Sequence, residues 1–276
     1  MARFELKGKT VVITGASGGI GTATALAFAK RGAKLVLSAR KIEPLEKLAE
    51  KLKASGAEAF VVPADVTKAE DMKMLAEKAI SLTGGLDVMM LNAGMGILGE
   101  VHHLSLEQWH KQMDLNFWGV LHGFYAALPQ FLKQGSGQYI IVNSLAGKIA
   151  MPLNSTYCAS KFALTGFADS VRQELRKKNI DMIAVYPGFV ATTFQANMQS
   201  PDYDVPRDLG HAIADPPEKI AEGIARASEK RKGEIVFTWN GNFGARYLPL
   251  SFTIAENFRR GFLNTSKKVM KRKTKV

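Results

Sequence analysis

Short runs of apolar, often β-branched residues alternate with longer segments of helical period, and this alternation limits the possible folds more than any other feature of the chain. Parallel strands need a crossover connection between them, which an amphipathic helix usually supplies. The sequence therefore predicts an α/β fold with about seven parallel strands in one doubly wound sheet and helices on both faces. Strands are predicted at 10–14, 34–38, 58–62, 88–92, 139–143, 181–186 and 234–238, and helices include 43–54, 68–82, 106–132, 157–178 and 217–229.

The composition agrees with a single globular unit. Of 276 residues, 46% are hydrophobic and 22% charged, which is enough apolar material for a sizeable core. Cys158 is the only cysteine, so no disulfide framework is possible, and a reducing, cytoplasmic location is expected. No stretch approaches the roughly 20 apolar residues of a membrane-spanning helix. We predict one catalytic domain over 1–240, a lid over the substrate at 189–216, and a C-terminal extension over 241–276.

The positive charge is concentrated near the C-terminus. Residues 222–276 carry 13 Lys or Arg and 4 Asp or Glu, which is +9 of the total net charge of +12. A uniformly basic face for nucleic acid is therefore not indicated, and we predict no nucleic-acid partner. The basic end predicts either peripheral membrane contact, a subunit arm or a solvated terminus.

The first predicted strand runs directly into the glycine-rich segment TGASGGIG. A strand, a glycine turn and a helix start together place backbone N–H groups and a positive helix end against a pyrophosphate. Gly15, Gly19 and Gly21 would let the backbone approach the ligand closely, and Ser17 and Ile20 complete the predicted contacts. A tight turn that serves only packing is the simpler alternative.

The end of the second predicted strand indicates which dinucleotide is bound. A carboxylate there would accept hydrogen bonds from a ribose 2′-hydroxyl, whereas a cation accommodates a 2′-phosphate. This chain has Ser38 and Arg40 and no carboxylate before Glu43. The sequence therefore favours NADP(H) over NAD(H), unless Arg40 is merely a solvated cation. Asp65 could accept from the adenine amino group, and Val66 follows it.

Three residues carry the predicted chemistry. Tyr157 and Lys161 are four residues apart and so share one face of a helix. A nearby ammonium would lower the pKa of the tyrosine and make it usable as a proton donor and acceptor. Ser144, at the end of a predicted strand, could hydrogen-bond the oxygen of a carbonyl or alcohol.

In order and spacing, TGASGGIG, LNAG at 91–94, Asn116 in DLNFWG, Ser144, YCASK and PG at 187–188 resemble the short-chain dehydrogenase/reductase family. The resemblance covers roughly residues 7–240 and implies a Rossmann-type fold. It implies a catalytic set of Asn116, Ser144, Tyr157 and Lys161, with Asn116 bending its helix. It also implies dimers or tetramers, and further cofactor contacts from Tyr157, Lys161, Asn92, Ala93, Gly94, Pro187, Gly188, Val190 and Thr192.

The function these residues predict is hydride transfer between NADP(H) and the carbonyl or alcohol of a small molecule, with Tyr157 as general acid/base. The C-terminal extension resembles the hydroxysteroid dehydrogenase-like branch, which favours a lipophilic substrate. The alternatives are a 3-oxoacyl thioester reductase and a non-catalytic NADP(H)-sensing protein with a basic tail. No metal site is predicted, because His102, His103 and His110 lack an acidic partner pattern.

Overall fold

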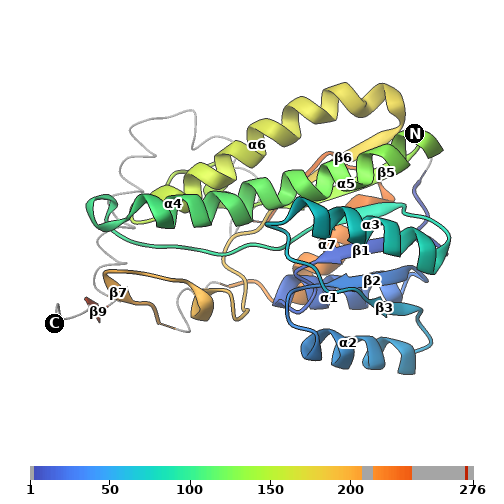
Figure 1. Cartoon of the computed structure of the whole chain (residues 1–276), viewed down its shortest axis with the longest axis horizontal. Helices are drawn as coiled ribbons and strands as arrows, with labels where there is room; N and C mark the ends of the chain where they lie inside the picture. Colours follow the sequence, from blue (N-terminus) through green and yellow to red (C-terminus); the bar gives the residue numbers. More distant parts are fainter. Residues whose placement is uncertain (1–2, 207–213, 238–270, 273–276) are drawn as a thin grey trace.

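A seven-stranded parallel sheet forms the centre of the molecule, as the computed structural model of residues 3–206, 214–237 and 271–272 shows (Figure 1). Its strand order is β3-β2-β1-β4-β5-β6-β8, and every neighbouring pair is parallel. The predicted fold class is therefore confirmed. The strands are β1 Thr10–Thr14, β2 Lys34–Ser38, β3 Ala59–Val61, β4 Val88–Leu91, β5 Gly137–Val142, β6 Ile180–Tyr186 and β8 Glu234–Val236.

The chain adds strands first on one side of β1 and then on the other, so the strand order reverses between β1 and β4. From β1 it adds β2 and β3 on one side, and then crosses to add β4, β5, β6 and β8 on the other. Loops leaving two adjacent strands in opposite directions open a crevice at the carboxyl ends of those strands. The sheet order therefore places a binding site after Thr14 and Leu91.

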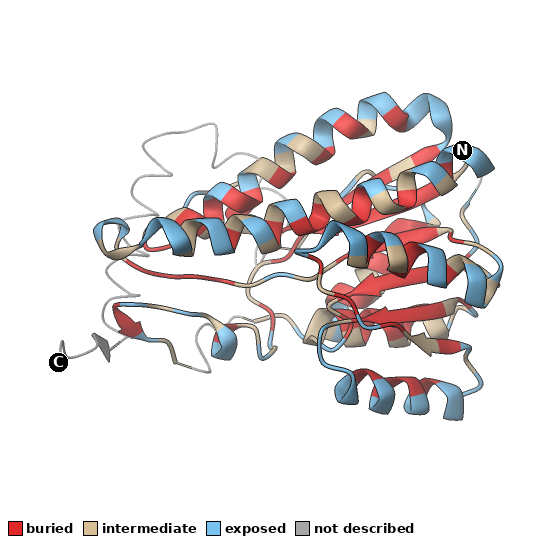
Figure 2. Cartoon of the chain, in the orientation of Figure 1, coloured by how far each residue is buried: buried red, intermediate tan, exposed pale blue. Residues whose placement is uncertain are grey.

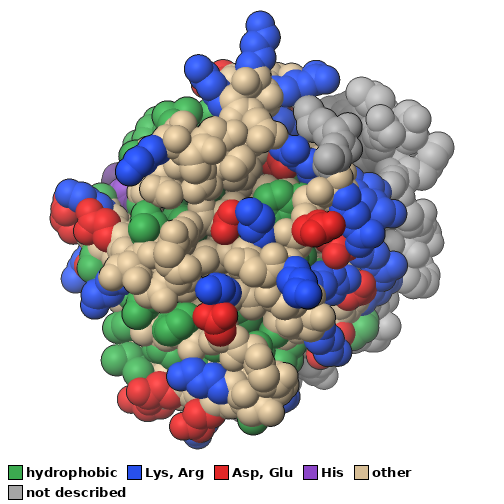
Figure 3. All heavy atoms as spheres, turned by 90° about the vertical axis from the view of Figure 1, so that its right-hand side faces the viewer, with side chains coloured by type: hydrophobic (Ala, Val, Ile, Leu, Met, Phe, Trp, Pro, Cys, Tyr) green, Lys and Arg blue, Asp and Glu red, His purple; other side chains and the backbone are tan. Residues whose placement is uncertain are grey.

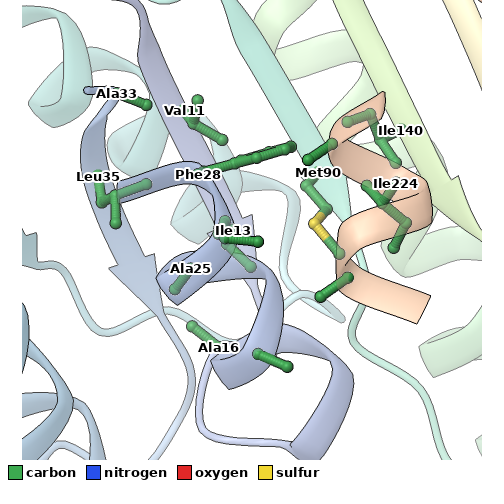
Figure 4. Packing of buried hydrophobic residues seen from close by; sticks show 14 of the residues in the cluster. Val11, Ile13, Ala16, Ala25, Phe28, Ala33, Leu35, Met90, Ile140 and Ile224 are labelled. Carbon is green, nitrogen blue, oxygen red and sulfur yellow. The ribbon is translucent and has the colours of Figure 1, made fainter. Parts of the chain in front are cut away.

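Helices cover both faces of the sheet and bury an alternating set of strand residues. Val11 and Ile13 of β1 pack with α1 (Gly19–Ala29), α2 (Glu43–Ala54) and α7 (Pro217–Glu229), and Figure 4 shows part of this cluster. Val12 packs on the opposite face with α3 (Ala69–Thr83), α5 (Gly119–Gln134) and α6 (Ser155–Leu175). The strands are almost wholly buried, whereas the helices expose their outer surfaces (Figure 2). Burial on both faces explains why the strands read as continuous apolar runs.

The long helix predicted over 106–132 contains a wider turn. α4 (Leu106–Met113) begins with a capping box between Ser105 and Gln108. A π-helix, η2 (Asp114–Trp118), follows and passes directly into α5. Insertions of this kind occur mostly as single turns within α-helices, often at functional sites. Here the π-turn contains Asn116, which is fully buried.

The segment after β6 is less regular. It contains a short 3₁₀ turn, η5 (Gln195–Asn197), and a two-residue strand, β7 (Tyr203–Asp204). β7 pairs antiparallel with β9 (Lys271–Arg272), a strand that lies beyond the seven predicted from the sequence. Residues 207–213 of the predicted lid lie outside the described residues. Residues 238–270 and 273–276, which include most of the predicted C-terminal extension, also lie outside the described residues. The membrane contact predicted for the extension falls largely on these residues.

Both signs of charge are interspersed on the face shown in Figure 3. Ion pairs join many of the charged groups, as between Arg31 and Glu222 at 2.6 Å and between Arg231 and Asp181 at 2.8 Å. Among the described residues, no helix has the length and apolarity needed to span a membrane.

Candidate active site

The glycine turn lies at the reversal point of the sheet, directly after β1. Gly15 has φ +62°, a conformation that disfavours side chains, and a Cβ there would lie 2.9 Å from Ala93 Cα. A Cβ on Gly21 would collide with the carbonyl oxygen of Gly15 and lie 2.9 Å from Ala16 Cα. Two of the predicted glycines are therefore required by the backbone itself.

The amino end of α1 is suited to an anion. Its N-cap, Gly18, provides no side-chain cap, and the first turn contains no acidic residue. Backbone N–H groups at a helix start that lack a side-chain cap carry partial positive charge and can bind phosphate. This end of α1 therefore fits the pyrophosphate of a dinucleotide, with Gly19, Ile20 and Gly21 in its first turn.

Asn92 joins the glycine turn to the end of β4. Its side-chain Nδ2 donates to the carbonyl oxygens of Thr14 and Gly15, each at 3.0 Å. The hydroxyl of Thr14 in turn accepts from the backbone N–H of Asn92 at 3.0 Å. These bonds set the loop of Asn92, Ala93 and Gly94, which the family resemblance implies as cofactor contacts, beside the glycine turn.

The predicted adenosine end lies at the edge of the same crevice. Ser38 is buried, and its hydroxyl has no partner among the described residues, whereas Arg40 is exposed. Burial of Asp65 opposes its ionisation, but hydrogen bonds from Thr67 and the charges of Arg40 and Lys68 outweigh it and lower its pKa. The cationic side chains are thus close enough to act on Asp65. Ser17 is exposed and Val66 buried.

Ser144 and Tyr157 are brought together at the end of β5. Ser144 follows that strand in an extended conformation, and its hydroxyl is hydrogen-bonded to Tyr157. Burial raises the pKa of Tyr157 to about 12, and the bond with Ser144 only partly offsets it. The predicted lowering of this pKa by Lys161 is therefore wrong for the structure as it stands, because desolvation dominates.

Lys161 lies behind Tyr157 in the same helix. Its Nζ donates to the carbonyl oxygen of Val142 at 3.0 Å and lies 5.7 Å from the centroid of the Tyr157 ring. The side chain is almost fully buried, and burial lowers the pKa of Lys161 to about 8. Lys161 is therefore a cation that can lose its charge near neutral pH.

Asn116 and Gln112 hold the loop that follows β4. Asn116 Oδ1 accepts from the N–H of Met95 at 2.9 Å, and its Nδ2 donates to Ser160 Oγ at 3.1 Å. Gln112, also fully buried, accepts from Ile97 N–H at 2.7 Å. Gln112 was not among the residues predicted from the sequence, although its position four residues before Asn116 could have indicated a shared helix face. A Cβ on Gly94 would lie 3.5 Å from Asn116 Oδ1 and 3.9 Å from Lys161 Nζ.

The first part of the predicted lid covers this arrangement with apolar side chains. The Phe194 ring lies 6.0 Å from the Tyr157 ring, and Phe194 and Met198 both come close to Gly96. The lid pairs with the loop after β4, since Gln199 N–H donates to Gly96 O at 3.0 Å. Thr192 places its methyl group against Gly19 of the glycine turn. The lid thus lies beside both the glycine turn and Tyr157.

The remaining predicted residues fall along the same edge. Pro187 O accepts from Leu145 N–H at 2.9 Å, which joins the PG segment to the turn after Ser144. Gly188 follows it, and Val190 is buried. Cys158 is buried as expected, and burial raises the pKa of its thiol. His103 and His102, however, do have acidic neighbours, Asp202 and Glu100, so the reason for excluding a metal site there was wrong.

A parallel sheet that reverses beside a glycine turn and an uncapped helix start defines a Rossmann-type nucleotide-binding fold. Residues 9–202 match the family described as short chain dehydrogenase, and the chain belongs to this family of oxidoreductases. An uncharacterized oxidoreductase of Listeria monocytogenes is 42% identical over 191 residues, which cover 68% of this chain and 77% of that relative.

Two solved structures resemble the whole arrangement. An alcohol dehydrogenase from Thermococcus sibiricus complexed with 5-hydroxy-NADP is 29% identical, with a TM-score of 0.74 over 83% of this chain and 95% of that one. A short-chain dehydrogenase/reductase from Burkholderia phymatum in complex with NAD is 25% identical, with a TM-score of 0.80 over 99% of both chains. Structural neighbours thus bind nicotinamide dinucleotides of both kinds.

Proposed function

We propose that the protein is an NADP(H)-dependent oxidoreductase that interconverts a carbonyl and an alcohol on a lipophilic small molecule. The observation that carries this proposal is the hydrogen-bonded Ser144–Tyr157 pair, backed by buried Lys161, at the sheet edge that also holds the glycine turn. The bound cofactor would supply or accept the hydride. The chain's own residues orient the substrate oxygen and move its proton.

Tyr157 acts as the proton donor when a carbonyl is reduced. Its raised pKa keeps the phenol protonated at neutral pH, so the proton is available as negative charge develops on the substrate oxygen. The hydroxyl of Ser144 binds the same oxygen and fixes it near the phenol. In the reverse direction, Tyr157 must first lose its proton and then accept one from the alcohol.

Lys161 stabilises the phenolate that remains after proton donation. An ammonium in a buried site interacts strongly with a nearby anion, because little water screens the charges. Asn116 and Gln112 hold the loop of Met95 and Ile97 over this part of the helix. We assign Asn116 to the catalytic set, since its side chain and the Lys161 ammonium both lie near Gly94, where Asn116 can order a proton-carrying water.

Arg40 supports NADP(H) as the cofactor. It is exposed at the end of β2, close enough to Asp65 for its charge to help lower the pKa of that carboxyl, and Lys68 adds a second cation. A 2′-phosphate would find both cations and the unpartnered hydroxyl of Ser38 at this edge. We propose that all the residues predicted to contact the cofactor do so.

A lipophilic substrate follows from the lid. Phe194 places its aromatic ring near Tyr157 and Gly96, and Met198 lies near Gly96. Such side chains gain free energy by contact with apolar groups. We also propose that the protein forms homo-oligomers. Trp118 of η2, Tyr125 of α5 and Phe162 of α6 are exposed apolar side chains of the kind that protein interfaces cover.

A substrate panel tests the proposal. Apolar ketones, aldehydes and 3-oxoacyl thioesters would be reduced with NADPH and NADH side by side. We expect turnover of apolar carbonyls and an NADPH preference of at least about tenfold. The Arg40→Ala variant should lose this preference. The matched control Lys47→Ala, which removes a positive charge at an exposed position of α2, should keep it.

Three outcomes would change the assignment. A strong NADH preference of the unaltered protein contradicts the role of Arg40. Selective turnover of 3-oxoacyl thioesters assigns the alternative reductase activity. Binding of NADPH without turnover of any carbonyl, together with salt-dependent binding to nucleic acid or anionic vesicles, assigns the sensing function.

A further inference from the structure

A second group of chemically active side chains lies in the loop after β4, beside Asp202 and Tyr203 of the lid. Glu100 and the histidines of η1 (Val101–His103) each offer one ligand atom, and these atoms all lie within 4.8 Å of one another. His102 Nε2 is 3.6 Å from Glu100 Oε2, and the two imidazole rings have centroids 4.0 Å apart. The proposed redox chemistry uses none of these groups.

Asp202, which belongs to the lid, contacts both His103 and Glu100. Its Oδ1 lies 2.5 Å from His103 Nδ1, and its Oδ2 accepts from the backbone N–H of Glu100 at 2.7 Å. Gly99 makes the approach possible, because a Cβ there would lie 3.2 Å from Asp202 Oδ2. The carboxylate is almost completely buried, with a side-chain exposure of 7%.

The carboxylate beside Nδ1 influences which ring nitrogen of His103 is free to bind a ligand. A carboxylate 2.5 Å from Nδ1 favours the tautomer that carries its proton on this nitrogen, and that tautomer leaves the lone pair of a neutral imidazole on Nε2. Histidines that bind metals are commonly held this way, with a carboxylate on the second ring nitrogen to fix the tautomer and raise ligand basicity. Asp202 thus leaves Nε2 of His103 available to bind a ligand from outside the protein.

We propose that Glu100, His102 and His103 bind a divalent transition metal of the zinc class, with Asp202 as the positioning residue for His103. Two imidazoles and one carboxylate are a ligand set that zinc uses, and they leave a coordination position for water. Ligands about 2.1 Å from a tetrahedral zinc ion lie roughly 3.4 Å apart, close to the 3.6 Å between His102 and Glu100.

Exposure and charge agree with such a site. His102 has a side-chain exposure of 64%, so an ion can enter from solvent and the ring can turn to close the remaining distance. Glu100 and Asp202 together supply two negative charges, which balance a divalent cation. Glu100 Oε1 also accepts from the Tyr203 hydroxyl at 2.7 Å, so a bound ion would hold the lid through both acidic residues.

Metal titration of the full-length, untagged protein tests this proposal. After treatment with a chelator and desalting, the protein would be titrated with Zn²⁺ by calorimetry and with Co²⁺ by visible absorption. We expect one equivalent per chain and displacement of Co²⁺ by Zn²⁺. His102→Ala and His103→Ala should each weaken binding at least about tenfold, and Asp202→Asn about ten- to a hundredfold.

His110→Ala is the matched control, because this histidine lies on α4 outside the group and should bind the metal as the unaltered protein does. Circular dichroism of each variant separates lost ligation from lost folding. If the unaltered protein takes up no Zn²⁺ at micromolar concentrations, the proposal is overturned. It is equally overturned if the folded double variant His102→Ala/His103→Ala binds as tightly as the unaltered protein.

Discussion

The catalytic end of the sheet and the lid above it are built in different ways. Ser144 lies two residues after the end of a six-residue strand, and Tyr157 and Lys161 belong to the 21-residue helix α6. The lid between 189 and 206 has one 3₁₀ turn and one two-residue strand, and it is held by contacts with the loop after β4 and with β9. Regular elements position the proposed reacting groups, whereas irregular chain forms the proposed substrate lid. Changes at the catalytic end should therefore act on turnover, and changes at the lid on substrate affinity.

Removal of the Tyr157 hydroxyl should produce the largest effect. Tyr157→Phe keeps the ring against Phe194 but removes the proton donor, and general acid catalysis contributes about 10²–10⁴-fold. We expect kcat to fall by at least about 100-fold while the dissociation constant for NADPH, measured by fluorescence, stays within about threefold. Tyr125→Phe, at an exposed tyrosine of α5, is the control. Near-normal reduction by Tyr157→Phe would remove this residue from the mechanism.

Disturbance of the glycine turn should come next in size and should affect cofactor binding. A Cβ on Gly21 meets the Gly15 carbonyl and the backbone of Ala16, which cannot move without changing the turn. We expect Gly21→Ala to weaken NADPH binding at least about tenfold. Gly85→Ala has nothing within 4 Å of the new methyl group and should bind NADPH normally. Equal affinity of both variants would show that the turn does not cradle the cofactor.

The pH profile tests the charge on Lys161. With a pKa of about 8, this lysine is protonated and cationic below that pH and neutral above it. Tyr157, with a pKa near 12, stays protonated throughout the same range. We therefore expect kcat/KM for carbonyl reduction to be level below about pH 8 and to fall up to about tenfold per unit above it. A level profile to pH 9.5, in protein that stays folded, would contradict the role of the cation.

Predictability from the sequence differed between the same two regions. The bounds of β1, β2, α2 and α7 agree with the residues predicted, because these elements follow hydrophobic periodicity and begin at clear signals, such as proline in the first turn of α2 and α7. The motif residues Gly15, Ser144 and Tyr157 also lie at the strand ends and the helix where their spacing placed them. Local patterns were sufficient for these parts of the chain.

Contacts between distant segments were not predictable in this way. The sequence shows neither that Asp202 meets His103 nor that β9 pairs with β7, because neither contact leaves a periodic pattern. The pKa of Tyr157 was predicted in the wrong direction for a related reason. The four-residue spacing to Lys161 was visible, but the burial that outweighs the ammonium depends on how the whole fold packs around the ring.

Shortening of the basic C-terminus should have the smallest effect and separates the two regions most clearly. Deletion of residues 267–276 removes β9 and with it the antiparallel partner of Tyr203 and Asp204. Backbone hydrogen bonds contribute about 0.5–1.5 kcal/mol each, so loss of this pairing should raise KM about two- to tenfold. We expect kcat to change little, because Ser144, Tyr157 and Lys161 belong to the sheet edge and α6. Deletion of 273–276 alone, which retains β9, should leave both constants unchanged. Should the longer deletion lower kcat and spare KM, the tail would act on the reacting groups themselves, and the division between catalytic end and lid would fail.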